Sequence, residues 1–134
     1  MNFTFKRSER LKSRKLIEKM FEEGSSFGQY PLRLVWLEHE IQDKEVMVQF
    51  TVSVSKKKFP KAVQRNALKR KMKEAFRLNK HQLYEHWNNE KPQYAWMVIY
   101  VAKEFQDFQT VEKAMVKIIR RFIKYQLKDT ETTL

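Results

Sequence analysis

The sequence predicts an α+β fold, a two-layer sandwich in which helices cover one face of a small sheet. Two patterns support this prediction. Residues 45–55 alternate almost without exception between apolar and polar side chains, as in a strand with one buried face. Residues 9–23 and the stretch that begins near Asp107 instead repeat their apolar side chains at the spacing of an amphipathic helix. The expected order is helix, strand, strand, helix, strand, helix, and the second strand is long enough to be bent into two.

The first half of the chain is predicted to contain one helix and two strands. The helix follows Ser8, covers residues 9–23 and ends at Gly24, because glycine is typical of helix C-termini. The first strand covers residues 32–38, and a turn connects it to the second strand at residues 45–55. The valines of the second strand share one face and its opposite face is polar, so we expect one side of the sheet to stay partly open to solvent.

The second half is predicted to contain two helices around one central strand. The first of these helices begins at about Pro60, since proline suits the first turn of a helix. An apolar strand follows at residues 94–102, and a last helix starts near Asp107, a candidate N-cap. We expect a single domain over residues 1–134, with its ordered core at about residues 6–127.

Lysine and arginine are concentrated in residues 56–80. This stretch holds 11 of the 28 basic residues and a single acid, Glu74. At helical spacing, a set of its polar side chains falls on one arc: Arg65, Asn66, Lys69, Arg70, Lys73 and Arg77. A solvated face would normally mix both signs, whereas like charges four residues apart repel one another. Together with a net charge of +12, the arc predicts a polyanionic partner, above all nucleic acid.

The composition argues against several other classes of protein. Cysteine is absent, which rules out disulfides and thiolate metal sites. No apolar stretch approaches the ~20 residues that a membrane span needs, and the start of the chain lacks the apolar region of a signal peptide. We therefore expect a cytoplasmic protein without a membrane partner. The three histidines are scattered and no phosphate-binding loop or hydrolase motif occurs, so we expect no catalytic residue and no metal site in the protein.

Residues 52–76 read VSVSKKKFPKAVQRNALKRKMKEAF. This segment resembles the signature of the bacterial ribonuclease P protein subunit, in which a V-S-K strand end leads to a helix bearing A-V-x-R-N-x-x-K-R. The specific part of the match is the ordered R-N-x-x-K-R motif at residues 65–70, because a basic helix alone is weak evidence. The N-terminus is similar as well, where R-L, a phenylalanine and a glycine follow the family's opening within residues 10–24. The resemblance extends from about residue 6 to residue 124.

The resemblance implies a fold, an activity and partners. The fold would contain an unusual left-handed β-α-β crossover. Proteins of the family bind a large catalytic RNA, and the complex removes the 5′ leader of precursor transfer RNA to give the mature 5′ end. The RNA active site of the family uses magnesium, so the resemblance implies magnesium held mainly by the RNA and no cofactor bound by the protein alone.

The resemblance also implies two sets of site residues. The set that would face the catalytic RNA is Lys56, Lys57, Lys61, Arg65, Asn66, Lys69, Arg70, Lys73 and Arg77. The set that would line a leader cleft, between the first helix and the open sheet face, is Ile17, Phe21, Thr51, Ser53 and Ser55.

Three positions depart from the family pattern. Ala67 stands where a third basic residue is frequent, and Ile17 stands where a second cleft aromatic is frequent. Lys73 replaces a common arginine, which keeps the charge and loses the bidentate fork. None of the three removes the R-N-x-x-K-R motif.

Two alternatives to this function remain open. A structural RNA-binding protein of the ribosomal-protein type would share the basic α+β design. A nuclease acting by itself would need a carboxylate or histidine constellation, which the sequence lacks. Phe21 has two interpretations as well, because it can anchor the first helix in the core or stack on a base of the leader.

Overall fold

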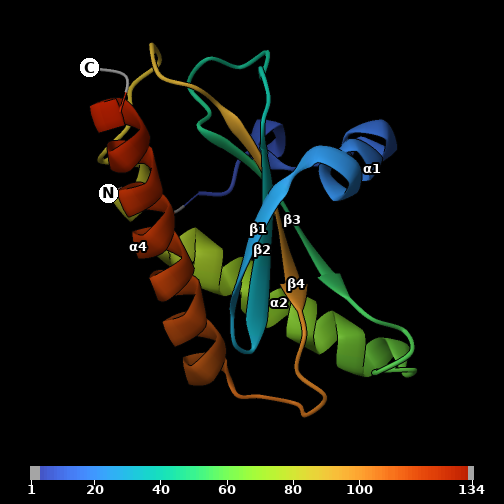
Figure 1. Ribbon diagram of the computed structural model, residues 1–134. Helices are drawn as coiled ribbons and strands as arrows, with labels where there is room; N and C mark the ends of the chain where they lie inside the picture. The colour runs from blue at the N-terminus through green and yellow to red at the C-terminus, as the bar shows by residue number, and fades with distance from the viewer. Residues whose placement is uncertain (1–3, 133–134) are drawn as a thin grey trace.

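A four-stranded sheet in the order β1-β2-β4-β3 lies at the centre of this computed structural model, which describes residues 4–132 and their side chains as far as Tyr125 (Figure 1). The strands are β1 Ser25–Gln29, β2 Leu32–Glu38, β3 Val48–Val54 and β4 Tyr94–Tyr100. The helices are the short 3₁₀ turn η1 Arg7–Glu9, α1 Arg14–Glu23, α2 Ala62–Asn79, α3 His81–Tyr84 and α4 Phe108–Thr132. No helix within the described residues is both long and apolar enough to cross a membrane. The predicted α+β class is confirmed.

Helices cover the two faces of the sheet unequally. On one face, α2 and α4 pack against the strands and against each other (Figure 1). Aromatic rings fill this main core: Phe50 of β3 stacks on Phe76 of α2 with ring centroids 4.0 Å apart, and Trp96 of β4 meets Phe122 of α4 edge-on at 4.9 Å. On the other face, α1 covers one end of the sheet over a smaller apolar cluster that includes Met20. The rest of that face stays open, as predicted.

The connection from β3 to β4 has an unusual hand. The two strands are parallel neighbours, so the chain between them crosses over the sheet through α2. In Figure 1 both strands run downward, β4 lies to the left of β3, and α2 passes behind the sheet. This path is left-handed, whereas about 98% of such crossovers are right-handed. The family resemblance implied this hand, and no periodicity in the sequence could have done so.

The start of the chain differs from the prediction. The helix predicted at residues 9–23 begins only at Arg14, and its N-cap is Ser13, whose hydroxyl accepts a hydrogen bond from a first-turn amide at 3.2 Å. The preceding segment runs along the outer edge of β3, where the Leu11 N–H donates to the Phe50 carbonyl at 3.0 Å. Leu11 fits the helical spacing of the prediction, but its backbone has a better partner in the sheet.

Strand β1 is an element that the sequence pattern does not predict. Its residues, SSFGQ, include one large apolar side chain, Phe27, which meets Trp36 of β2 edge-on at 5.6 Å. This segment is a strand because it pairs with β2 over all five of its residues, although its own sequence has no alternating pattern. The other predicted elements agree with the structure to within a few residues, with two exceptions. The second predicted strand is not bent into two, because β3 is one strand, Val48–Val54, and the short helix α3 follows the basic helix after Asn79.

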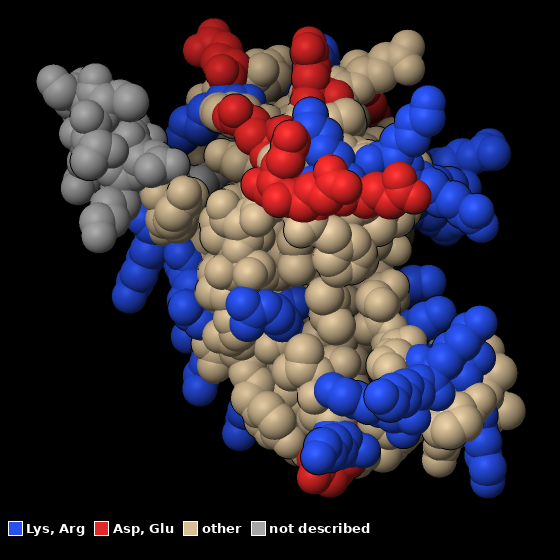
Figure 2. Space-filling model, turned by 45° about the vertical axis from the view of Figure 1, so that its right-hand side comes forward, with Lys and Arg blue, Asp and Glu red and all other residues tan. Residues whose placement is uncertain are grey.

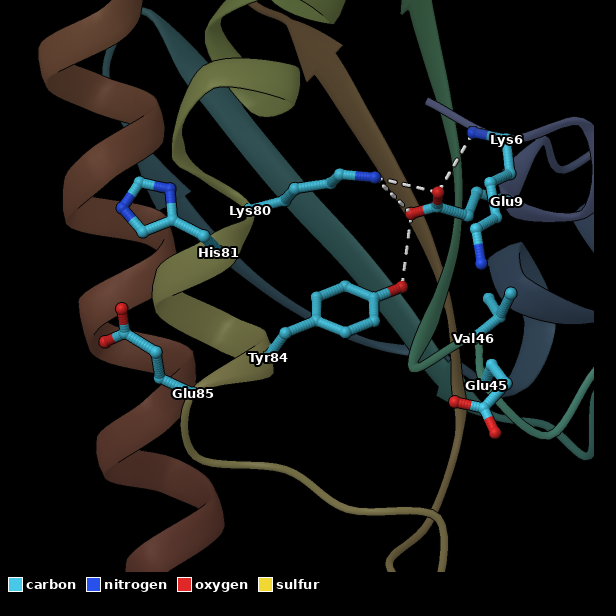
Figure 3. Close-up of a pocket in the computed structure, with 8 residues that line it drawn as sticks. All are labelled: Lys6, Glu9, Glu45, Val46, Lys80, His81, Tyr84 and Glu85. Atoms are coloured by element: carbon cyan, nitrogen blue, oxygen red, sulfur yellow. Dashed lines mark hydrogen bonds and ion pairs between the residues drawn. The ribbon is translucent and has the colours of Figure 1, made fainter. Parts of the chain in front are cut away.

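A buried ion pair ties the N-terminal segment to the end of α2 (Figure 3). The Lys80 ammonium lies 2.7 and 2.8 Å from the two carboxylate oxygens of Glu9, and these side chains are only 7% and 3% exposed. The Tyr84 hydroxyl donates to the same carboxylate at 3.1 Å, and the Lys6 backbone N–H donates to it at 3.0 Å. Burial, and then the charge of Glu9, raises the pKa of Tyr84, so its hydroxyl stays a donor. The pair thereby fixes the segment that leads into α1.

Removal of one partner of this pair is expected to destabilise the protein strongly. Lys80→Ala leaves the Glu9 carboxylate buried without its counter-ion, which should lower the free energy of unfolding by about 3–5 kcal/mol. Lys44→Ala breaks the exposed Lys44–Glu40 pair and is the matched control, with an expected loss of at most about 1 kcal/mol. Chemical denaturation measures both variants. Equal losses would contradict a special role for the buried pair.

Candidate nucleic-acid interface

Docking of one side of α2 on the core decides which of its side chains face outward. The buried side consists of Leu68, Met72, Ala75 and Phe76, which pack against the sheet and α4. The helical period then turns the predicted polar arc toward solvent. Within that arc Asn66, Arg70 and Lys73 are exposed, and Arg65, Lys69 and Arg77 are half-buried. The structure thus brings these predicted residues together along one side of a rigid rod.

Four members of the arc form an outward row: Asn66, Lys69, Arg70 and Lys73. Within the described residues, their side chains make no hydrogen bond or ion pair. Their donors are therefore available to an outside partner, and a polyanion bound along the row would relieve the repulsion between its charges.

The other two members of the arc are engaged within the protein. Arg65 donates through Nη1 to the carbonyls of Phe59 and Pro60, at 2.9 and 2.7 Å, and so closes the turn before α2. Arg77 forms an ion pair with Glu74, the single acid of the basic segment. The hydrogen bond from Arg77 lowers the pKa of Glu74, which keeps that carboxylate ionised and reduces the charge at this end of the arc.

The loop between β3 and α2 adds further cations. The Ser55 hydroxyl accepts hydrogen bonds from the two backbone N–H groups at residues 57 and 58, at 3.1 and 3.3 Å, and so bends the chain. Ser55, which is also a predicted leader contact, therefore helps to form this turn. Lys56, Lys57 and Lys61 are exposed, whereas the Lys58 ammonium donates to a backbone carbonyl just after β4 at 2.8 Å. The first turn of α2 contains no acid, so the positive end of its dipole adds to this charge.

Thr51 and Ser53 lie on the sheet face that α1 covers only in part. The strand register pairs Thr51 with Met97 and Ser53 with Ile99 of β4. Met97 belongs to the apolar cluster under α1, so Ser53 lies one row further from α1 than Thr51. Figure 2 shows the middle of this face as mostly uncharged, with acidic side chains among lysines and arginines at its α1 end and lysines and arginines gathered toward the start of α2.

Ile17 and Phe21 lie one turn apart on α1 and differ in burial. Ile17 packs half-buried against the cluster under α1, whereas Phe21 is 62% exposed. This exposure excludes the interpretation that Phe21 anchors α1 in the core. The helix ends at Gly24, where an added Cβ would clash with the Met20 carbonyl, so glycine allows β1 to begin at the next residue.

A pocket of about 560 Å³ lies beside the buried ion pair (Figure 3). Two of its lining groups, Glu9 and Lys80, are already paired with each other, so neither is poised to move a proton for a substrate. Among the described residues, no three His, Cys, Asp or Glu side chains come together in a group that could hold a metal ion. The outward row of α2 offers cations and hydrogen-bond donors, which suit phosphate groups.

Comparison with known proteins identifies the family of this fold and surface. The family model described as Ribonuclease P matches residues 5–123. The chain belongs to the ribonuclease P protein family. A ribonuclease P protein component from Porphyromonas gingivalis is 40% identical over 122 residues, which cover 89% of this chain and 86% of that protein. One from Chlorobium phaeobacteroides is 30% identical over 126 residues, 87% of this chain and 86% of that protein. The solved RNase P protein from Thermotoga maritima matches with a TM-score of 0.66 at 26% identity, over 84% of this chain and 96% of that one.

Family membership gives the chain its general role. A ribonuclease P protein is the protein component of an endoribonuclease ribonucleoprotein, in partnership with the ribonuclease P RNA, and acts in the 5′ processing of transfer RNA. The resemblance that rested on residues 52–76 is thereby confirmed. Sequence patterns missed one cation of the open face in this ribonuclease P protein, Arg33 of β2. The signal available in the sequence was a single arginine between two leucines in the predicted strand at residues 32–38.

Two arginines of the R-N-x-x-K-R motif are expected to differ in their effect on stability. Arg65→Ala removes both hydrogen bonds that close the turn before α2, which should lower the free energy of unfolding by about 1–3 kcal/mol. Arg70→Ala removes an exposed side chain and should leave stability unchanged within about 0.5 kcal/mol. Thermal and chemical unfolding measure both variants. A loss in Arg70→Ala as large as that in Arg65→Ala would contradict the outward placement of the row.

Proposed function

We propose that this chain is the protein subunit of a bacterial ribonuclease P that binds the catalytic RNA along the outward row of α2 and the 5′ leader of precursor transfer RNA on the open sheet face. The observation that carries the proposal is the outward row itself, whose side chains have no partner among the described residues. Cations spaced along a rigid helix suit the phosphates of a structured RNA.

Binding of the catalytic RNA is mainly electrostatic in this proposal. Each cation that meets a phosphate releases a counterion, so assembly weakens as the salt concentration rises. Arg70 offers a bidentate fork to one phosphate, whereas Lys69 and Lys73 act as point charges. The exposed lysines Lys56, Lys57 and Lys61 extend the contact past the start of α2. Arg65 and Arg77 add positive charge while their hydrogen bonds hold the helix and its preceding turn.

The leader lies across the open sheet face in this proposal. Phe21 presents an exposed ring on which a base can stack, and the hydroxyls of Thr51 and Ser53 can bond to sugar or phosphate. Ile17 offers an aliphatic surface, so we assign stacking to Phe21 alone. These contacts end once the leader is cleaved, and they therefore favour the precursor over the mature transfer RNA.

The RNA carries the catalytic centre in this proposal, and the protein contributes binding and position. Magnesium held mainly by the RNA supplies the Lewis acid for phosphodiester hydrolysis. Among the described residues, no group of three His, Cys, Asp or Glu side chains could hold the metal ion in place of the RNA. We place the reaction in the cytoplasm.

Reconstitution tests this function. Purified protein is mixed with bacterial ribonuclease P RNA and precursor transfer RNA at low magnesium, and 5′ processing is followed. Cleavage is expected when both protein and RNA are present, and none is expected with the protein alone. Arg70→Ala should weaken assembly by about 1–3 kcal/mol because a charged hydrogen-bond donor is lost. Cleavage by the protein alone would identify a nuclease, and tight binding to ribosomal RNA without any effect on processing would identify a structural RNA-binding protein.

Phe21→Ala should separate leader binding from folding. Because the ring is 62% exposed, we expect a stability loss below about 1 kcal/mol. Affinity for precursors with leaders of several nucleotides should fall by about 1–3 kcal/mol, as expected for loss of a stacked base, and affinity for mature transfer RNA should not change. Phe105→Ala is the matched control, because Phe105 is 48% exposed and contacts Lys71 of α2 on the other side of the sheet. Identical binding by both variants would exclude stacking on Phe21.

A further inference from the structure

Arg33 is a charged side chain in β2 on the open sheet face. The strand register places it beside Gly28 of β1 and Ile99 of β4, and Ser53 of β3 follows in the same row. The side chain is exposed, and within the described residues it pairs with no carboxylate. It is therefore a positive charge without a counter-ion in a row whose other members are uncharged.

The guanidinium of Arg33 is held in place by β1. Its Nη2 donates to the Ser26 hydroxyl at 2.9 Å. An added Cβ at Gly28 would lie 3.3 Å from Nη1, so the guanidinium extends over the strand where glycine leaves room for it. The hydrogen bond to Ser26 uses one of five donors, and the others stay available on an exposed group. A group that is already positioned loses less entropy when it binds a ligand.

The row that contains Arg33 lies next to the row that α1 covers, and its Ile99 packs against the edge of the apolar cluster there. The neighbouring row includes Val35 and Met97, which are buried beneath α1 and only 7% and 3% exposed. Rows on one sheet face repeat about every 7 Å along the strands, and Ser53, two strands from Arg33, lies about 10 Å across the face. A cation thus stands on one side of the open face and a hydroxyl on the other, with the half-buried Ile99 between them.

We propose that Arg33 binds a phosphate of the 5′ leader, on the side of the cleft opposite Ser53. This inference rests on the proposed function, and it adds the one charged contact to a leader set whose other side chains are uncharged. A guanidinium fork matches two oxygens of a phosphate. Arg33 lies two strands away from Ser53 and from the lysine-bearing loop that follows β3, so only a leader long enough to cross the sheet from that edge reaches it.

Arg33→Gln tests the inference in the assembled ribonucleoprotein. Equilibrium affinity is measured for precursors whose leaders grow by one nucleotide at a time. With the wild-type protein, affinity rises with leader length until the strand passes Arg33. With Arg33→Gln, short leaders bind as in the wild type and long leaders bind about tenfold more weakly, because a charge-assisted hydrogen-bond pair is lost. Arg33→Lys restores part of this loss, since it keeps the charge without the fork.

Arg121→Gln is the matched control for the loss of one positive charge and of one side-chain hydrogen bond to β1 of the β1–β2 hairpin. Arg121 of α4 reaches β1 from the opposite face of the sheet, where its Nη1 donates to the Gly28 carbonyl at 2.7 Å and its guanidinium lies over Phe27. This variant loses the same charge and a bond to the same strand, and its effect on affinity should not depend on leader length.

Three results would count against the inference. If Arg33→Gln weakens every precursor and mature transfer RNA equally, or gives the same profile as Arg121→Gln, then Arg33 stabilises the hairpin and does not bind the leader. If the wild-type complex itself shows no dependence on leader length, the proposed leader cleft is wrong, and the inference fails with it.

Discussion

Burial of one side of α2 is the constraint on which the rest of the structure depends. Phe76 stacks on Phe50 at 4.0 Å, and Leu68 and Met72 are fully buried. A close-packed core does not allow such a helix to rotate, so the polar side must face outward even though its cations repel one another. Packing energy offsets that repulsion in the free protein. The same packing presents cations in a fixed row, which reduces the entropy lost when a polyanion binds.

The buried Glu9–Lys80 pair extends this constraint to the other face of the sheet. Lys80 directly follows α2, and Glu9 directly precedes the segment that pairs with β3 and leads into α1. Buried ion pairs add little net stability compared with apolar packing, but the loss of one partner is costly. We therefore interpret this pair as fixing the position of the segment before α1 relative to α2, and with it the open sheet face relative to the outward row.

Charge is distributed unevenly over the open face. At the α1 end, acidic side chains lie among lysines and arginines, whereas lysines and arginines predominate toward the start of α2 (Figure 2). Such a distribution draws a polyanion toward the loop between β3 and α2. At the α1 end, the exposed ring of Phe21 offers an uncharged contact. Arg33 supplies positive charge in the middle of the face, where the sheet is otherwise uncharged.

The sequence by itself determined the elements that have one buried side. The strand at residues 45–55 and the polar arc of α2 follow from periodicity, because burial of one side imposes a repeat along the chain. The apolar run of β4 is continuous instead, because both of its faces are buried. The order of residues in the R-N-x-x-K-R motif determined the family, and with it the left-handed crossover that periodicity cannot encode.

Only the tertiary structure decided the features that depend on partners far away in the chain. Strand β1 exists because β2 pairs with it, and α1 starts late because Leu11 bonds to Phe50. Arg65 and Arg70 look alike in the sequence, yet one closes a turn and the other faces solvent. The exposure of Phe21 and the row that joins Arg33 to Ser53 likewise depend on how elements dock. A local pattern records which side of an element is buried, and long-range packing decides what lies opposite it.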